Sequence, residues 1–287
     1  MKKVVIIANR LNAIQGLQEL EDIEVVRLYI LEGSLLDKQR EIISLGKQVE
    51  VIKFTMKDKA RLISEIASLE FDLLISNGCP FILPVTKIRK DSQLFINIHP
   101  TLLPDLKGKT PLSGVFMTHR KFIGATMHYI DDGIDTGNII AQKKVELTPD
   151  IDQGLVYQIS FELEKDAFVE GMVKLQESNY QYQGVAQQGE GSYFNRTNEL
   201  QTIDMQKDKT DIIIDKIKSF NLRGQGTSLS TSEHEYKIYF AERITNPYLL
   251  KRYEKLPPSD IVLAYDNKVI LRTMDGMLKL IDYEVVE

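Results

Sequence analysis

The chain has 287 residues, of which 43% are hydrophobic and 27% charged, and its formal net charge is −5. This balance is typical of a soluble globular protein that forms one large domain, alone or with a small addition. The acidic charge and the lack of a basic tract in the sequence argue against general nucleic-acid binding, and the single cysteine excludes a disulfide framework.

The first residues resemble the start of a signal peptide, because two lysines precede the apolar run Val4 to Ala8. However, this run is short, and Asn9 and Arg10 end it. No apolar run in the sequence approaches the roughly 20 residues that a membrane-spanning helix needs. The sequence therefore predicts a cytoplasmic protein without a membrane segment.

Strands and helices alternate along the first half of the chain. Short runs rich in β-branched residues predict strands at 4–8, 24–29, 49–54, 71–76 and 94–98, and apolar residues at helical spacing predict helices at 11–19 and 57–69. Two further strands are expected at 124–130 and 138–147, and a long helix is expected to end near Glu177. We therefore expect an α/β fold with a doubly wound, mostly parallel sheet.

The composition changes near residue 178. Residues 181–196 are rich in Gln, Gly, Ser and Asn, which predicts a linker. Residues 197–287 are expected to form a small, mostly β appendage with a helix at 211–220 and strands at 236–241, 261–265, 268–272 and 278–284. Asp266-Asn267 and Asp275-Gly276 are credible hairpin turns between these strands.

Asn97 and His99 lie on the strand that Pro100 ends, and they point to the same face because strand side chains alternate. In open parallel sheets the ligand crevice lies at the carboxyl ends of the strands. Asp135, in the Gly- and Asp-rich loop 131–137, is expected near the same crevice. An amide, an imidazole and a carboxylate suit acyl transfer to an amine. Asn97 and a protonated His99 would donate hydrogen bonds to the oxyanion, while Asp135 would raise the pKa of His99. From the residues alone, a structural or solvated role also remains open.

The run Asn97-Ile98-His99-Pro100-Thr101-Leu102-Leu103-Pro104, followed by Gly108 and by residues 131–137, resembles the folate-dependent formyltransferases. The 36-residue interval from His99 to Asp135 is similar to the spacing of that family. The resemblance implies that Asn97, His99 and Asp135 are the catalytic residues, that residues 1–180 are the catalytic domain, and that N10-formyltetrahydrofolate is the formyl donor. No metal is implied. The pterin site would contain Cys79, Pro80, Phe81, Ile82, Leu83, Phe95, Ile130, Asp131, Asp132, Gly133 and Ile134.

Within that family, the sequence is most similar to sugar-nucleotide N-formyltransferases. The expected acceptor is a nucleotide-linked amino-deoxy sugar used in surface glycan synthesis, with no nucleic-acid or membrane partner; a homodimer is left open. Five residues are candidates for contact with this substrate: Asn9, Arg10, Lys107, Gly108 and Lys109. For the two lysines, a solvated pair is the alternative interpretation. Of the other histidines, His128 is expected to be packed, and His119 and His234 are expected at the surface.

Four other functions remain as alternatives. A methionyl-tRNA formyltransferase needs a basic surface, whereas residues 186–287 contain fourteen Lys or Arg and sixteen Asp or Glu. Glycinamide ribonucleotide formyltransferases resemble a single domain with a phosphate loop, which the run Ala8-Asn9-Arg10-Leu11-Asn12 does not match. A formyltetrahydrofolate hydrolase would carry an added regulatory domain. A non-catalytic folate-binding module would not need the three polar residues.

Overall fold

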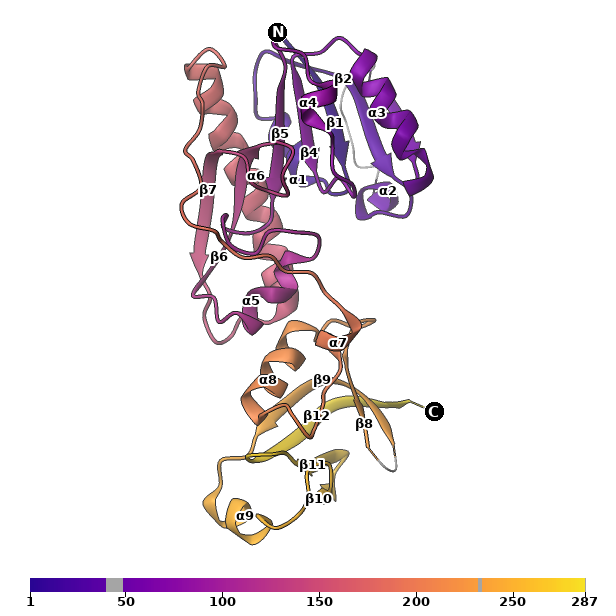
Figure 1. The fold of residues 1–287 in the computed structure, drawn as a ribbon, viewed down its shortest axis with the longest axis vertical. Helices are drawn as coiled ribbons and strands as arrows, with labels where there is room; N and C mark the ends of the chain where they lie inside the picture. Colours follow the sequence, from indigo (N-terminus) through magenta and orange to yellow (C-terminus); the bar gives the residue numbers. More distant parts are fainter. Residues whose placement is uncertain (40–48, 232–233, 287) are drawn as a thin grey trace. The chain divides into compact units, whose positions relative to one another are not determined.

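The computed structural model describes residues 1–39, 49–231 and 234–286, which divide into two compact units (Figure 1). The first unit contains residues 1–109, 122–146 and 158–193. The second contains residues 110–121, 147–157 and 194–287. The boundary after Tyr193 falls inside the segment 181–196 that composition marks as a linker.

A seven-stranded sheet forms the centre of the first unit, with the strand order β3-β2-β1-β4-β5-β6-β7. The first five strands are parallel to their neighbours, while β6 and β7 run antiparallel. This confirms the doubly wound, mostly parallel sheet. The strands are β1 (Lys2–Ala8), β2 (Ile23–Leu31), β3 (Glu50–Phe54), β4 (Leu73–Asn77), β5 (Leu94–His99), β6 (Phe122–Tyr129) and β7 (Ile139–Glu146).

Helices cover both faces of this sheet because its central strands are apolar on both faces. In β1, alternate residues pack into two separate cores: Val4 and Ile6 on one face, Val5 and Ile7 on the other. The first core is completed by α1 (Asn12–Leu17), α2 (Leu35–Gln39) and α6 (Gln153–Glu177), and the second by α3 (Lys59–Ser68) and α4 (Val85–Ile88). A 3-10 turn, η2 (Met56–Asp58), precedes α3.

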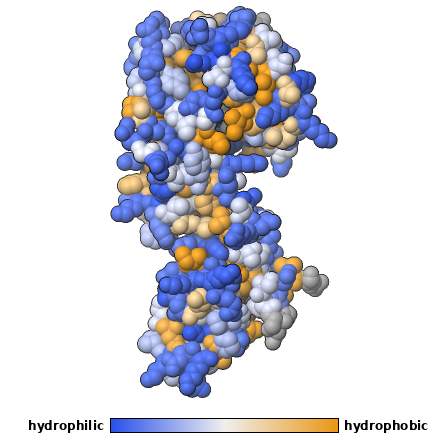
Figure 2. All heavy atoms as spheres, in the orientation of Figure 1, coloured by the Kyte–Doolittle hydropathy of each residue, from blue (hydrophilic) through white to orange (hydrophobic). Residues whose placement is uncertain are grey.

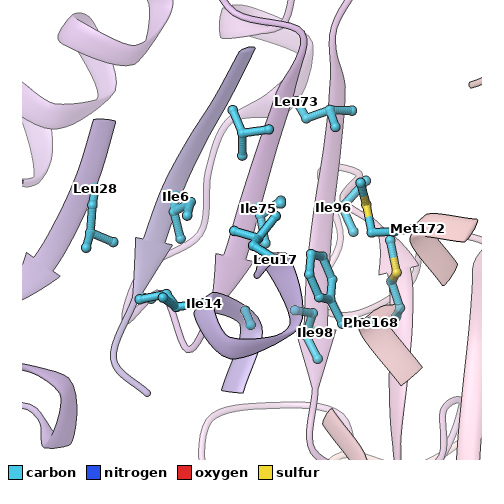
Figure 3. Packing of buried hydrophobic residues seen from close by; sticks show 14 of the residues in the cluster. Ile6, Ile14, Leu17, Leu28, Leu73, Ile75, Ile96, Ile98, Phe168 and Met172 are labelled. Carbon is cyan, nitrogen blue, oxygen red and sulfur yellow. The ribbon is translucent and has the colours of Figure 1, made fainter. Parts of the chain in front are cut away.

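The long helix α6 supports the strand that carries Asn97 and His99. Phe168 and Met172 of α6 share the first core with Ile96 and Ile98 of β5, as Figure 3 shows. All four side chains are at most 2% exposed. The apolar face of β5 is thus fixed, and its polar residues are left on the opposite face.

The second unit contains a five-stranded antiparallel sheet with the order β10-β11-β12-β9-β8. Its core includes Ile213 and Ile217 of α8. The mostly β appendage is therefore confirmed, and Asp266 and Asn267 both have the positive φ (47° and 55°) of a tight hairpin turn. The elements of this unit are η3 (Pro111–Ser113), α5 (Gly114–Met117), α7 (Asn198–Gln201), α8 (Thr210–Ser219), β8 (Thr227–Ser230), β9 (Glu235–Arg243), α9 (Pro247–Arg252), β10 (Ile261–Tyr265), β11 (Lys268–Arg272) and β12 (Met277–Val286).

Hydrophobic side chains reach the surface of the first unit near α3 and α4 (Figures 1 and 2). Met56 and Ile82 are both 51% exposed. In the ranges that the structure describes, no helix combines the length and the apolar character that crossing a membrane requires.

Candidate active site

The predicted site residues gather where β4 and β5 end. Asn97 and His99 lie on β5, and Ser76 of β4 pairs with Asn97 in the parallel register. On the other side, β6 runs antiparallel to β5 and places His128 directly opposite Asn97. Polar groups from three adjacent strands therefore meet at one edge of the sheet, which is where such sheets hold their ligands.

Asn97, His99 and Asp135 lie close together in the structure. The Nδ2 atom of Asn97 donates a hydrogen bond to Oδ1 of Asp135 at 3.4 Å, and Nδ1 of His99 lies 3.5 Å from Oδ2. The main-chain N–H of Gly108 also donates to Oδ2, at 2.9 Å. Two loops far apart in the sequence, 100–109 and 131–137, therefore converge on the Asp135 carboxyl group.

The hydrogen bond of His99 shows which ring nitrogen is available for chemistry. Nε2 lies 2.9 Å from the carbonyl oxygen of Leu106, which is an acceptor, so Nε2 carries a proton and donates it. In the neutral ring, Nδ1 then has a lone pair and faces Asp135. His99 can therefore exchange a proton through Nδ1 while Nε2 stays bonded.

Asp135 raises the pKa of His99 as expected, but the expectation of a protonated His99 is wrong. Burial lowers this pKa, because the cation is poorly solvated, and the raising effect of Asp135 is smaller. The net pKa lies below 6.5, so the resting imidazole is neutral at neutral pH rather than protonated. A buried, neutral imidazole with a free Nδ1 suits a general base better than a charged hydrogen-bond donor.

His128 belongs to the same polar network, although the sequence suggests only a packed side chain. It is buried, at 2% exposure, and its Nδ1 donates to the carbonyl oxygen of Tyr129 at 2.7 Å. Nδ2 of Asn97 can only donate, so Nε2 of His128, at 3.0 Å, is the acceptor of that hydrogen bond. Ser76 Oγ donates to Oδ1 of Asn97 at 2.7 Å, so both ends of the amide are fixed.

Asp135 is held as a carboxylate. Burial raises its pKa, but the nearby His99 and His128 and the Gly108 N–H together outweigh burial. Its pKa therefore lies well below the usual 3.8. Within the described residues, no group of three or more His, Cys, Asp or Glu side chains is placed to hold a metal ion.

The two segments expected to bind the pterin lie beside this network. The Oδ1 atom of Asp132 accepts a hydrogen bond from the main-chain N–H of Thr86 at 3.2 Å, which joins the loop after β6 to the segment after β4. Ile82 and Ile134 are 51% and 43% exposed, while Leu83 and Phe95 are buried. Exposed apolar side chains above buried ones fit a flat aromatic ligand. Burial raises the pKa of Cys79 to about 12, so its thiol stays protonated.

The cations expected to bind the substrate differ in their surroundings. Arg10 forms an ion pair with the buried Glu164, and Asn9 donates to the carbonyl oxygen of Gly78. Lys107 is only 5% exposed; its ammonium lies 3.4 Å from the carbonyl oxygen of Glu190 and over the ring of Tyr193. Lys109 is the exposed member of the three.

Residues 3–172 match the formyl transferase family model, and the chain belongs to that family. A methionyl-tRNA formyltransferase from Carboxydothermus hydrogenoformans is 28% identical over 122 residues, which is 42% of this chain and 40% of that protein. This chain aligns with less than half the length of the curated relatives it matches.

Two solved structures are similar over nearly the whole chain. An N-formyltransferase from Helicobacter canadensis, solved with folinic acid and dTDP-3-aminofucose, has a TM-score of 0.68 at 18% identity and covers 99% of this chain and 100% of its own. WlaRD, a sugar 3N-formyl transferase solved with dTDP and 5-N-formyl-THF, has a TM-score of 0.69 at 18% identity, with 100% of this chain and 98% of its own covered. At these identities the likeness concerns the fold.

Proposed function

We propose that this protein transfers a formyl group from N10-formyltetrahydrofolate to the amine of a nucleotide-linked amino-deoxy sugar. The observation that carries the proposal is the convergence of Asn97, His99 and Asp135 at the carboxyl edge of a sheet that belongs to the formyl transferase family. The folate would supply the activated formyl carbon, held between the segments around Ile82 and Ile134.

The residues would act on the proton and on the charge of this reaction. An attacking amine must lose a proton, and the free Nδ1 of the neutral His99 can accept it. The imidazolium formed would be stabilised by the Asp135 carboxylate, 3.5 Å away. Negative charge on the formyl oxygen needs a donor, and Nδ2 of Asn97 can provide it by releasing its long 3.4 Å bond to Asp135.

Two observations support a sugar nucleotide as the acceptor. Two solved structures that match over nearly the whole length of both chains, and therefore over the antiparallel C-terminal region, were solved with a folate and a dTDP compound. The C-terminal residues 186–287 carry a net charge of −2, which gives little attraction for a polyanion such as tRNA. Methionyl-tRNA remains the second candidate, because it is the acceptor named in several of the curated relatives.

The deciding experiment is a panel of amino-sugar nucleotides linked to dTDP, UDP or GDP. Each would be mixed with the protein and N10-formyltetrahydrofolate, and mass spectrometry would detect the gain of one formyl group. We expect at least one sugar nucleotide to react and charged initiator tRNA to remain unformylated. If the tRNA were formylated efficiently and every sugar nucleotide stayed inert, the acceptor would be the tRNA and not a sugar nucleotide.

A further inference from the structure

Residues 183–193 cross both loops that carry the site, and we call them the strap. At one end, Val185 and Ile139 exchange two main-chain hydrogen bonds of 2.8 Å. At the other end, the N–H of Lys107 donates to the carbonyl oxygen of Ser192 at 2.8 Å. The strap is therefore bonded to the start of β7, just after the Asp135 loop, and also to the loop that follows His99.

The strap also contacts Leu106, the residue whose carbonyl group fixes the His99 ring. Ser192 Oγ accepts a hydrogen bond from the N–H of Leu106 at 3.0 Å, and the carbonyl oxygen of Leu106 accepts the Nε2 proton of His99. The approach is close at the preceding residue as well. A Cβ atom at Gly191 would lie 2.0 Å from the carbonyl oxygen of Pro104, so only glycine fits there.

Gln187 holds the Asp135 loop from the middle of the strap. Its Nε2 donates to the carbonyl oxygens of Asp135 and Gly137, each at 2.9 Å. Asp135 has a φ of 54°, in the left-handed region that few non-glycine residues adopt. Such a conformation persists when its surroundings enforce it, and here one amide group binds the carbonyls on both sides of Thr136.

We propose that Gln187 is a positioning residue for formyl transfer, and that its amide keeps the Asp135 carboxylate against Nδ1 of His99. This inference rests on the proposed function for the role of Asp135 in the reaction, but the geometry on which it acts can be measured without any acceptor. The amide would act as a hydrogen-bond donor, so that a side chain of the same size without the donor would not replace it.

The test is an NMR titration of the His99 ring in the full chain. The charged and titratable groups that act on His99 are Asp135, which raises its pKa, and His128 and Arg10, which lower it. A looser Asp135 loop lets the carboxylate move away from His99, so of these three effects only the one that raises the His99 pKa becomes weaker. His99 should therefore titrate at lower pH in Gln187→Met, and Asp135→Asn should show the largest shift that loss of this carboxylate can give.

Gln188→Met is the matched control. Gln188 is an exposed neighbour on the same strap, and its Nε2 donates only to the Ala186 carbonyl oxygen, at 3.2 Å, among the hydrogen bonds described. We expect it to leave the His99 titration unchanged. Gln187→Glu keeps the shape of Gln but places a carboxylate against two carbonyl oxygens. Because a new anion near His99 would itself raise the His99 pKa, this variant is tested by its rate of formyl transfer alone.

The second readout is formyl transfer with whichever sugar nucleotide the panel identifies. Both Gln187 variants should lower kcat about ten- to a hundredfold, the scale of a misplacement of about 1 Å, with little change in KM for the folate. If Asp135→Asn shifts the His99 titration while Gln187→Met matches the wild-type titration and both Gln187 variants match the wild-type rate, the inference is wrong and the proposed function stands. If Gln187→Met shifts the titration but no acceptor reacts, the positioning role stands and the proposed function fails.

Discussion

Nδ1 of His99 lies 3.5 Å from Oδ2 of Asp135, and this carboxyl group raises the pKa of the buried imidazole. Burial acts in the opposite direction and is larger, so the pKa of His99 stays below 6.5. The reactivity of the site thus depends on a balance between desolvation and one carboxylate.

The pH dependence of catalysis should follow His99. A general base must be deprotonated, so kcat/KM should fall on the acid side with an apparent pKa below 6.5. Asp135→Asn removes the effect that raises the His99 pKa, so it should lower the rate and also move this acid limb to lower pH. The control is Asp91→Asn, at an exposed aspartate outside the site. An acid limb that stays in place in Asp135→Asn would show that His99 is not the titrating group.

Asn97→Ala should lower kcat by roughly a hundred- to a thousandfold, the effect of losing one oxyanion donor, which is about 2.7–4 kcal/mol.

Ser76→Ala should lower kcat less than Asn97→Ala does, by about two- to tenfold, because it removes one hydrogen bond that orients the Asn97 amide. Ser160→Ala is the control, since Ser160 is buried and its hydroxyl has no hydrogen-bond partner in the described structure. Equal losses in the two serine variants would argue against an orienting role for Ser76.

Folate binding should stabilise the protein. A ligand that binds only the folded state at about a hundred times its Kd adds about 2.7 kcal/mol, so 5-formyltetrahydrofolate should raise the Tm. Ile82→Glu puts a charge on the expected pterin wall and should reduce this rise. Val173→Glu on α6 is the matched control; Val173 is 39% exposed and Ile82 is 51% exposed. No rise in Tm for the wild type at millimolar ligand would contradict folate as the formyl carrier.

The exposed Lys109 is the best candidate to contact a diphosphate, because Lys107 is buried under the strap and Arg10 is paired with Glu164. Lys109→Ala should raise KM for the sugar nucleotide severalfold and leave KM for the folate nearly unchanged. Lys3→Ala removes an equally charged lysine on β1, near the amino end of the strand, and should change neither constant. A rise in both constants for Lys109→Ala would point to a role in folding or in the folate site instead.

Arg10 should also stabilise the fold, because it pairs with the buried Glu164. Burial raises the pKa of Glu164, and Arg10 opposes this rise. Removing Arg10 leaves the carboxylate uncompensated, so Arg10→Met should lower the free energy of unfolding by about 3–5 kcal/mol at neutral pH. Without Arg10 the pKa of Glu164 in the folded state is raised further. The loss of unfolding free energy should therefore grow as pH rises. Chemical denaturation at pH 5 and pH 8 measures it.

Two variants test whether the loss comes from the unpaired carboxylate. Glu164→Gln, combined with Arg10→Met, should recover much of the stability, since no buried charge remains. Lys165→Met breaks the solvent-exposed pair with Glu19 and should cost about 1 kcal/mol or less. A loss of the same size in Lys165→Met would mean that burial is not the cause.

The sequence was sufficient for the sheet because its signals are local. The apolar run Val4 to Ala8 predicts a buried strand. Because the run has no polar residue on either face, it also predicts that helices cover both faces of the sheet. Asn97 and His99 could be placed on one face by strand alternation alone. His128 could not be placed in the network, because its position opposite Asn97 depends on the antiparallel register of β6, which no local pattern specifies.

The strap escaped prediction for a related reason. Residues 181–196 lack hydrophobic periodicity, so composition predicts a linker, yet their contacts depend on main-chain groups and on one amide, Gln187. The burial of Lys107 follows from the same contacts. Such interactions form between segments far apart in the chain, and they leave no periodic signal in the sequence.

The reach of the strap matters to anyone who shortens this protein. A chain cut after Tyr180 would keep every strand of the seven-stranded sheet and all of α6. It would nevertheless lose the partners of the Asp135 and Gly137 carbonyls and of the Leu106 N–H. A fragment ending at Tyr193 keeps those partners, so comparing the two fragments would separate the ability to fold from the ability to hold a reactive geometry.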